Sequence, residues 1–317
     1  MLKHLDIIRA YENITKYKNA TPLQYSGTLS RMTGNQIFLK PENLQFTGSF
    51  KLGGALNVMA KFAKKENNNG VVTCSAGNWA QAVAYAAQKF KSRSVIVMPE
   101  KASPVKIEAT KRYGAEVVLF GKDSNDVTNK ANEIAYQEGL TFLSPFDDEE
   151  VIAGHGVVGL DIIKEKPDSE VIICPVGSGA FISGILLALK ETNPRIKIIG
   201  VEPLNSNAMW LSLQANKIVE KERIDTIADG LALKKPGELP FQIVKKYVDD
   251  IVLVNEDEIK RAVLLLLERA KLLVEPSGAV SIAALMFGKI DIKNKEIVAI
   301  LSGGNVELHK LADFIKN

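Results

Sequence analysis

Short runs of apolar and β-branched residues recur along the chain, and each is followed by a turn and a segment with helical spacing. Several of these runs are apolar on both faces, as strands buried inside a parallel sheet require. Strands are predicted at residues 36–39, 71–74, 94–98, 116–120, 171–175, 196–201, 251–254 and 297–301. Because strands and helices alternate, we expect an α/β fold with helices on the faces of mostly parallel sheets.

Two of the helical segments carry clear local signals. Residues 79–90 place their apolar side chains on one helical face, a spacing typical of a helix packed on a core. Residues 256–272 follow Asn255, a favourable N-cap, and Glu258 stands at the spacing of a capping box. Both segments therefore predict amphipathic helices.

The strand and helix units fall into two groups, which predicts two domains, each an open, mostly parallel twisted sheet flanked by helices. Residues 66–143 are expected to form a small domain, and residues 1–65 and 144–317 a large one. Polar, glycine and proline turns at 67–70 and 144–145 are the predicted hinges. Ligands in such folds bind at the carboxyl ends of strands, so the loops that follow the strands are the candidate binding segments.

The composition narrows the class of partner. The 317 residues are 46% hydrophobic and 24% charged, the balance of a globular protein with a sizeable core. The net charge of +3 is small and the lysines are spread along the chain, so no nucleic-acid partner is predicted. No apolar run reaches the roughly 18 residues that cross a bilayer, and the N-terminal segment carries charges. We therefore expect a cytoplasmic protein without a membrane partner.

The sequence contains few residues that could form disulfides or bind metal ions. The two cysteines, Cys74 and Cys174, lie a hundred residues apart, and the three histidines are scattered. Two thiols make neither a disulfide framework nor a zinc site. Both cysteines are therefore expected to be reduced packing residues, and no metal site is predicted.

One lysine has a sequence environment suited to covalent chemistry. Lys51 lies between Phe50 and apolar neighbours at the start of a predicted helix, with Gly53 and Gly54 in its first turns. Each glycine costs up to about 1 kcal/mol there relative to alanine, which suggests that something approaches the backbone closely. A desolvated lysine has a lowered pKa, and its neutral amine attacks carbonyl groups. The alternative is an exposed lysine at a helix start.

Two other loops could contact a ligand. Ser75, Ala76, Gly77 and Asn78 lead from a strand into a helix, where free backbone N–H groups form a site for a carboxylate. Ordinary capping of that helix by Ser75 or Asn78 is the alternative. Ser302 follows the last predicted strand, where its hydroxyl could hydrogen-bond a ring nitrogen. A plain turn is the alternative there.

A loop of small residues follows the predicted strand at 171–175 and opens the next helix. It consists of Gly177, Ser178, Gly179, Ala180 and Phe181. Small residues let the backbone wrap a phosphate, and the helix dipole favours its charge. A dinucleotide fold also places glycines here, and Glu202 ends the next strand where a ribose-binding acid would lie. The third glycine of that fingerprint would fall at Ile182, so the loop fits a monophosphate better than a pyrophosphate.

Taken together, these loops and the segments between them resemble the fold-type II pyridoxal-phosphate enzymes, and most closely the threonine and serine dehydratase branch, which is similar to serine racemase. The matching segments are Lys40-Pro41-Glu42-Asn43, Gly48-Ser49-Phe50-Lys51, Ser75-Ala76-Gly77-Asn78, Tyr113-Gly114-Ala115, Phe146-Asp147, Ile152-Ala153-Gly154, Gly200-Val201-Glu202-Pro203, Ala228-Asp229-Gly230, Val274-Glu275-Pro276-Ser277-Gly278-Ala279 and Ser302-Gly303-Gly304-Asn305. The likeness spans nearly the whole chain. It implies a fold like that of the tryptophan synthase β subunit, with a large cofactor-binding domain and a small domain that closes over the substrate.

The resemblance also implies a role for each loop. Lys51 would hold pyridoxal 5′-phosphate as a Schiff base, and Phe50 would pack beside its ring. Asn78 would hydrogen-bond the phenolic oxygen, and residues 75–78 would bind the substrate carboxylate. The loop at 177–181 would hold the phosphate, and Ser302 would face the pyridine nitrogen. Lys51 would then act as the general base at Cα, with the cofactor as electron sink.

The implied reaction is the dehydration and deamination of L-threonine, L-serine or both, to a 2-oxo acid and ammonia. A neutral serine at the ring nitrogen weakens the electron sink and suits prompt loss of a β-hydroxyl. Racemisation needs a second acid/base group, and the racemases similar to this chain carry a serine where Ala76 stands. Their divalent-ion site uses the glutamate at Glu202 and an acid six residues on, where this chain has Ala208. Dehydration is therefore favoured, without a metal.

Several alternatives stay open at the level of sequence. β-Replacement and threonine-synthase-like chemistry use the same cofactor, and a non-catalytic homologue could bind it without turnover. The family usually has histidine at Trp79, arginine at Gly53 and glutamine at His155. The resemblance further implies a homodimer or a dimer of dimers. No C-terminal regulatory domain is expected after the Ser302 loop.

Overall fold

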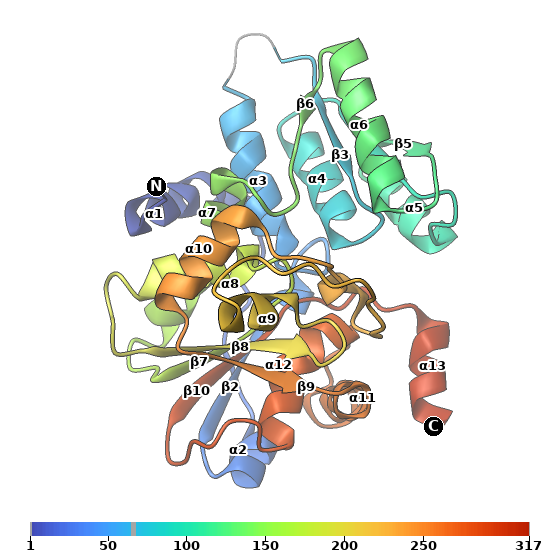
Figure 1. Ribbon diagram of the computed structural model, residues 1–317. Coiled ribbons are helices and arrows are strands. Elements are labelled where there is room, and N and C mark those ends of the chain that lie inside the picture. Colours follow the sequence, from blue (N-terminus) through green and yellow to red (C-terminus); the bar gives the residue numbers. More distant parts are fainter. Residues whose placement is uncertain (1, 65–67, 317) are drawn as a thin grey trace.

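The computed structural model describes residues 2–64 and 68–316, whose strands form two sheets flanked by helices (Figure 1). The larger sheet has the order β1-β2-β10-β7-β8-β9 and the smaller sheet β5-β4-β3-β6. The larger sheet consists of β1 (Gln24–Tyr25), β2 (Gln36–Pro41), β7 (Val171–Pro175), β8 (Lys197–Pro203), β9 (Asp250–Val254) and β10 (Glu296–Leu301). The smaller sheet consists of β3 (Val71–Cys74), β4 (Ser94–Met98), β5 (Glu116–Leu119) and β6 (Thr141–Phe142).

All neighbouring strands pair in parallel except β1, which is antiparallel to β2. Each of the eight predicted strands is present, with ends that differ by no more than two residues. The sequence missed β1 and β6, because two residues are too few to show a period. The expected α/β architecture with mostly parallel sheets is confirmed.

The helices occupy the segments between the strands and after the last one. They are α1 (His4–Ile14), α2 (Gly27–Thr33), α3 (Lys51–Phe62), α4 (Asn78–Lys89), α5 (Pro104–Arg112), α6 (Ser124–Glu138), α7 (Glu149–Glu165), α8 (Ala180–Leu189), α9 (Ala208–Gln214), α10 (Glu238–Tyr247), α11 (Glu256–Leu265), α12 (Pro276–Met286) and α13 (Leu308–Lys316). In the described part of the chain, no helix combines the length and the apolar character that a membrane span needs.

The predicted helix at 256–272 is only partly α-helical. Asn255 caps α11 by accepting a hydrogen bond from the Glu258 N–H at 3.0 Å, and Glu258 returns the bond to the Asn255 N–H at 2.8 Å. This is the predicted capping box. The α-helix ends at Leu265, and a π-helical turn (Leu266–Ala270) precedes Lys271, which has φ +60°. The wider turn and its left-handed residue end the helix before residue 272.

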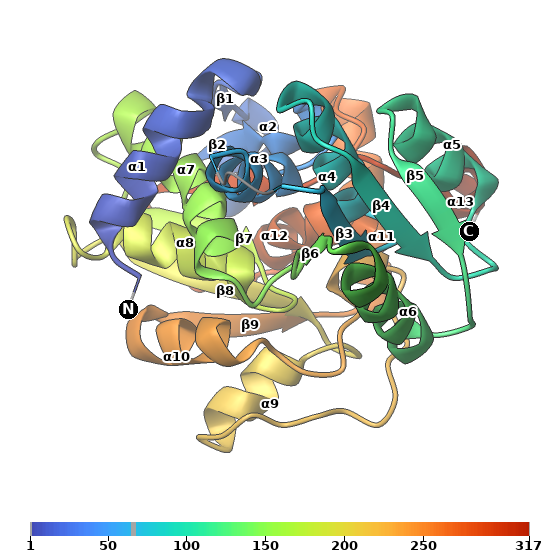
Figure 2. The same ribbon diagram turned by 90° about the horizontal axis from the view of Figure 1, so that it is seen from above.

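The larger sheet is covered on both faces, because successive residues of each strand point to opposite sides. On β7, Ile172 packs in the core beneath α7 and α8, whereas Ile173 packs in the core against α12 and α2. Figure 2 shows α1, α7 and α8 together along one side of this sheet. The core beneath α7 and α8 continues through α3 and α4 to the smaller sheet, so one set of buried side chains joins the two sheets.

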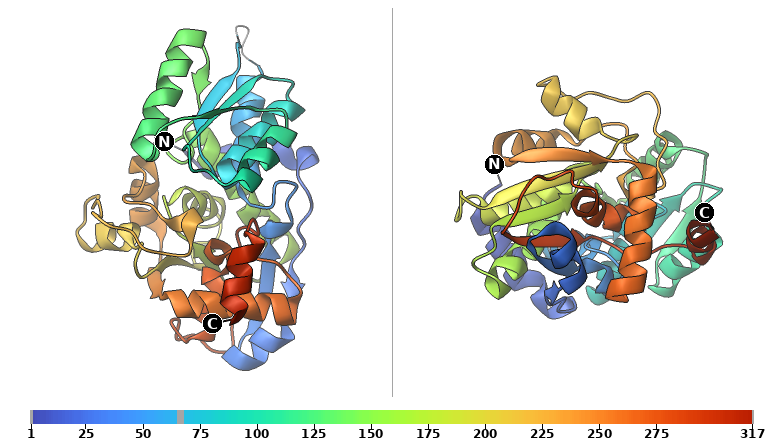
Figure 3. Two further views of the ribbon diagram at one scale, coloured as in Figure 1. Left: turned by 90° about the vertical axis from the view of Figure 1, so that its right-hand side faces the viewer. Right: turned by 90° about the horizontal axis from the view of Figure 1, so that it is seen from below.

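The smaller sheet lies above the larger one and carries α6 on its outer face (Figure 3, left). Its strands run from Val71 to Phe142, inside the range predicted for a small domain. The predicted boundary at 65/66 and the first residue of the predicted hinge at 67–70 lie outside the described residues. The domain limits therefore stay a prediction.

Candidate active site

The loop before α3 and the loop after β10 are paired through their backbones. Ser49 and Gly303 form an antiparallel bridge, and the Phe50 N–H donates to the Ser302 carbonyl oxygen at 3.0 Å. Lys51 therefore begins α3 directly beside the carboxyl end of β10. This edge of the larger sheet is where ligands bind in folds of this kind.

Lys51 lies in an environment that favours its neutral form. Its Nζ lies 5.2 Å from the Phe50 ring centre and 5.9 Å from that of Trp79, and donates to the Pro145 carbonyl oxygen at 3.3 Å. No carboxylate among the described residues forms an ion pair with this amine. Desolvation lowers the pKa of Lys51 from 10.5 to about 8. At neutral pH about a tenth of such amines are uncharged and nucleophilic.

Aromatic rings connect Lys51 to the small-residue loop. The Phe50 and Phe181 rings stack with centroids 3.8 Å apart, and His155 meets Phe50 edge-on at 4.8 Å. His155 is fully buried, and neither of its ring nitrogens has a hydrogen-bond partner within the described residues. Burial, with a smaller contribution from the charge of Lys51, holds the pKa of His155 well below 6.5. The imidazole is therefore neutral at physiological pH.

The loop at 177–181 ends at the start of α8, whose free N–H groups and dipole favour an anion. Gly179 has φ +91°, a conformation that side chains disfavour. A Cβ at Gly179 would also lie 2.4 Å from the Met209 side chain. Ser178 is buried and its hydroxyl accepts from the Ala180 N–H at 3.4 Å. The positive φ thus requires glycine at this turn, and phosphate binding there stays a prediction.

Residues 75–78 form the turn between β3 and α4. The Ser75 hydroxyl accepts from the Gly77 N–H at 3.2 Å, and space is open around the Cα of Gly77. Asn78 opens α4 next to Trp79, which lines the Lys51 amine. The half-exposed Ala76 offers only a methyl group at this turn. The Trp79 ring therefore relates this turn to the Lys51 amine, and carboxylate binding by the N–H groups that open α4 stays a prediction.

Ser302 directly follows β10 and is buried, 3% exposed. Its hydroxyl donates to the Ser277 carbonyl oxygen at 3.5 Å, a long and weak hydrogen bond from which the hydroxyl hydrogen can rotate toward a ligand. The structure thus brings Phe50 and Lys51 next to the Ser302 loop through backbone contacts. Phe181 joins this group by stacking on Phe50, and Asn78 joins it because the neighbouring Trp79 ring lies beside Lys51.

Sequence reasoning gave no role to three residues that the structure places here. Pro145 supplies the carbonyl oxygen for Lys51. Glu275 accepts from Asn78 Nδ2 at 2.7 Å, and Asn305 Nδ2 donates to Asn78 Oδ1 at 2.8 Å. Glu275 could have been found from its neighbours in the sequence, which are apolar on one side and small on the other. Such a composition predicts that the acid is buried.

Glu202 has a different role from the ribose-binding acid considered above. Its carboxylate is 1% exposed and accepts from the N–H groups of Met209 and Trp210, at 3.1 and 2.7 Å, so it caps α9. Desolvation raises the pKa of Glu202 to about 8. In residues 2–64 and 68–316, no group of three or more ligand-type side chains is placed to hold a metal ion.

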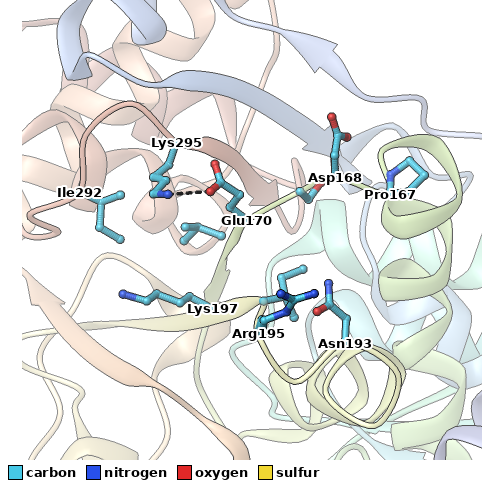
Figure 4. Close-up of a pocket in the computed structure, with 11 residues that line it drawn as sticks. Pro167, Asp168, Glu170, Asn193, Arg195, Lys197, Ile292 and Lys295 are labelled. Carbon is cyan, nitrogen blue, oxygen red and sulfur yellow. Dashed lines mark hydrogen bonds and ion pairs between the residues drawn. The ribbon is translucent and has the colours of Figure 1, made fainter.

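A cavity of about 360 Å³ lies at the opposite edge of the larger sheet (Figure 4). It is lined by residues at the amino ends of β7, β8 and β10, including Glu170, Lys197 and Lys295. The Glu170 carboxylate accepts from Lys295 Nζ at 2.7 Å inside it. Lys51 and its neighbours belong to the carboxyl edge, so this cavity is not part of the candidate active site.

Comparison with known proteins places the chain in a family. The model of a family described as "Pyridoxal-phosphate dependent enzyme" matches residues 14–303. The chain belongs to the pyridoxal-phosphate dependent enzyme family. It is 45% identical to an L-threonine ammonia-lyase of Thermotoga maritima over 96% of this chain and 76% of that protein. It is 41% identical to the catabolic L-threonine dehydratase of Escherichia coli over 97% of this chain and 94% of that protein.

The fold agrees with this family. A structure of maize serine racemase superposes with a TM-score of 0.94 at 32% identity, covering 99% of this chain and 97% of that chain. The gathered residues also suit pyridoxal phosphate, which has an aldehyde, a phosphate and a ring nitrogen. The desolvated Lys51 amine, the glycine turn at α8 and the hydroxyl of Ser302 offer one matching group for each.

Proposed function

We propose that this pyridoxal-phosphate enzyme dehydrates and deaminates L-threonine, L-serine or both, giving a 2-oxo acid and ammonia. The relatives named above are an L-threonine ammonia-lyase and an L-threonine dehydratase, each matched over nearly the whole of this chain. The observation that carries the proposal is the Lys51 amine, desolvated at the start of α3 and bonded through its neighbours to the Ser302 loop.

Lys51 is proposed to hold the cofactor and then to remove the Cα proton of the substrate. A bound pyridoxal phosphate supplies an electron sink for the charge that this proton leaves behind. Phe50, which directly precedes Lys51, is fixed by its stacking on Phe181 and excludes water from one side of the amine. Trp79 excludes water from another side. An amine with a pKa of about 8 is matched to taking and returning a proton near neutral pH.

The remaining loops are proposed to bind the polar groups of the cofactor and the substrate. Gly177, Ser178, Gly179 and Ala180, with Phe181, would hold the phosphate at the start of α8. Ser75, Ala76, Gly77 and Asn78 would bind the substrate carboxylate through the first turn of α4. The second N–H of Asn78 would reach the phenolic oxygen.

Ser302 would present a neutral hydroxyl to the ring nitrogen, and this favours elimination over long-lived carbanion chemistry. Serine cannot hold a proton on that nitrogen as a carboxylate does, so charge leaves the substrate promptly with the β-hydroxyl. Racemisation would need a second proton donor, and the methyl group of Ala76 cannot act as one. The high structural similarity to a serine racemase therefore reflects a shared fold.

We also propose that residues 66–143 close over the substrate as a small domain. Lys106 on α5 pairs with Asp229 at 3.2 Å, and the Ser103 hydroxyl lies 3.1 Å from Glu307, so polar contacts join the two units. We further propose that the protein forms a homodimer or a dimer of dimers in the cytoplasm, with no nucleic-acid or membrane partner. Sedimentation velocity of the purified protein tests the assembly.

One spectroscopic experiment tests the reaction. Purified protein with pyridoxal phosphate should absorb near ~410–420 nm, where this cofactor absorbs when held by a lysine. The band should be absent in Lys51→Ala and present in Lys61→Ala, which removes an exposed lysine of the same helix. Added L-threonine should give 2-oxobutyrate, and L-serine pyruvate. Product formation only with O-acetylserine and a thiol would replace the proposal with β-replacement, and turnover of none of these would refute it.

A further inference from the structure

Glu275 is a buried carboxylate that joins the two sheets at the candidate site. It lies just before α12, is 5% exposed, and forms no ion pair within the described residues. Its Oε1 accepts from Asn78 Nδ2 at 2.7 Å, and its Oε2 accepts from the Asn305 N–H at 3.1 Å. Two donors therefore converge on this side chain, one on each oxygen.

These contacts fix the orientation of the Asn78 amide. Asn305 Nδ2 donates one hydrogen to Asn78 Oδ1 at 2.8 Å and the other to the Thr47 carbonyl oxygen at 2.8 Å. Asn78 must therefore present its oxygen to Asn305 and its nitrogen to Glu275. One N–H of Asn78 is left for a ligand. The Asn78–Glu275 pair also packs on the Ser302 loop, since a Cβ at Gly303 would lie 2.4 Å from Glu275 Oε1.

The ionised carboxylate satisfies both donors better than the protonated carboxyl. A carboxylate accepts at each oxygen, whereas a protonated carboxyl turns one oxygen into a donor that faces another donor. Such a conflict is costly inside a protein, and it frees Asn78 to move. The charge of Glu275 thus holds the nitrogen side of the Asn78 amide, while Asn305 holds its oxygen side.

The surroundings bring the ionisation of Glu275 into the neutral range. Burial is the largest cause and the charge of Asp229 the next, and together they raise the pKa of Glu275 to about 7. The hydrogen bond from Asn78, the charge of Lys106 and the Asn305 N–H lower it. Lys106 pairs with Asp229 at 3.2 Å, and Lys310 on α13 approaches the same carboxylate at 3.9 Å. The Asn78 and Asn305 amides and the Ser277 hydroxyl, which accepts from Gly230, are uncharged.

We propose that Glu275 is a positioning residue whose ionised form aims the free N–H of Asn78 at the phenolic oxygen of the cofactor, so that protonation of Glu275 switches the site off. The inference rests on the proposed cofactor site. It predicts a loss of activity on the acid side of neutrality, caused by a carboxyl group that touches neither substrate nor reacting atoms. Lys51, whose pKa is lowered to about 8, titrates in a neighbouring range, so the test has to separate the two groups.

Glu275→Gln tests the proposal, because an amide reproduces the donor conflict of the protonated carboxyl at every pH. The holoenzyme is titrated from pH 5.5 to 9 while the absorption band of the cofactor and kcat/KM are recorded. The wild type should show the ionisation of Glu275 near pH 7 in both readouts, below that of Lys51 near pH 8. The Glu275→Gln variant should lack the lower of these ionisations, so its cofactor absorption band at pH 8 should match that of the wild type at pH 6. Its kcat should fall about 10-fold or more. Glu256→Gln, which replaces another helix-start carboxylate that accepts one N–H at 2.8 Å, should behave as wild type.

A double-mutant cycle locates the effect at Asn78. Once Asn78 is alanine, Glu275→Gln should cost little more in kcat, because the amide that it aims is gone. Additive losses would overturn the proposal, and so would an unchanged pH profile in Glu275→Gln. If the glutamine variant does not fold, Glu275→Asp decides, because two acceptor oxygens remain and the ionisation should persist. A wild type that forms no cofactor band at all would instead refute the proposed cofactor site.

Discussion

The Trp79 indole donates a hydrogen bond from Nε1 to the Thr73 hydroxyl oxygen at 2.9 Å, and its ring centre lies 5.9 Å from the Lys51 amine. Thr73 in turn donates to the Leu143 carbonyl oxygen at 2.7 Å, so a chain of hydrogen bonds ties α4 to β3 and to the end of β6. Trp79 is 3% exposed. Trp79, which stands where the family usually has histidine, is therefore held rigidly in the interior.

Trp79→Phe should lower the free energy of unfolding by about 1–3 kcal/mol, because it removes the indole donor and leaves a gap beside Thr73. Urea unfolding of the apoprotein measures this. Tyr85→Phe is the matched control on the same helix, because the described residues give its hydroxyl no hydrogen-bond partner, and it should change the value by less than about 0.5 kcal/mol. Equal effects of both substitutions would contradict the role of the Trp79–Thr73 bond.

Lys51→Met should stabilise the apoprotein at pH 7. The folded pKa of Lys51 is about 8, below its unfolded value of 10.5, so folding opposes protonation of this amine. The destabilisation caused by Lys51 has its full size below pH 8 and vanishes above about pH 10.5. We expect a gain on the order of 1–3 kcal/mol at pH 7 in urea unfolding, which shrinks as the pH rises toward 10. A constant difference across this range would argue against a desolvated amine.

His155→Gln should make the apoprotein less sensitive to acid. The folded pKa of His155 lies well below 6.5, so only the unfolded chain takes up this proton as the pH falls through 6.5. Stability conferred by the neutral imidazole is therefore present above that pH and lost below it. Between pH 7 and 5 the wild type should lose up to about 2 kcal/mol more than the variant in urea unfolding. Parallel pH profiles would contradict this assignment.

Ala76→Ser should add a proton donor at the turn before α4 and with it a slow racemase activity. We expect D-serine to form from L-serine in the variant and not in the parent, while dehydration falls by less than about 10-fold. Chiral chromatography of the amino acid and an assay for pyruvate measure the two outcomes. If dehydration is retained and no D-serine appears, a further group besides the missing hydroxyl blocks racemisation.

The pattern of apolar residues was enough to predict the eight longer strands and the α/β class, because a strand buried on both faces must be apolar along its length. The Asn255–Glu258 capping box was equally predictable, since both partners lie within one turn. The π-helical turn at Leu266–Ala270 was not, because it depends on how the end of α11 packs.

The sequence by itself determined the family, through the order of Lys51, the turn at Ser75, the glycine loop at 177–181 and Ser302 along the chain. Tertiary structure alone decided which polar groups meet. Asn78 and Glu275 stand 197 positions apart, and no period or local motif relates them. The partner of a buried polar side chain is set by which elements pack together, whereas a strand or a cap is set by residues a few positions away.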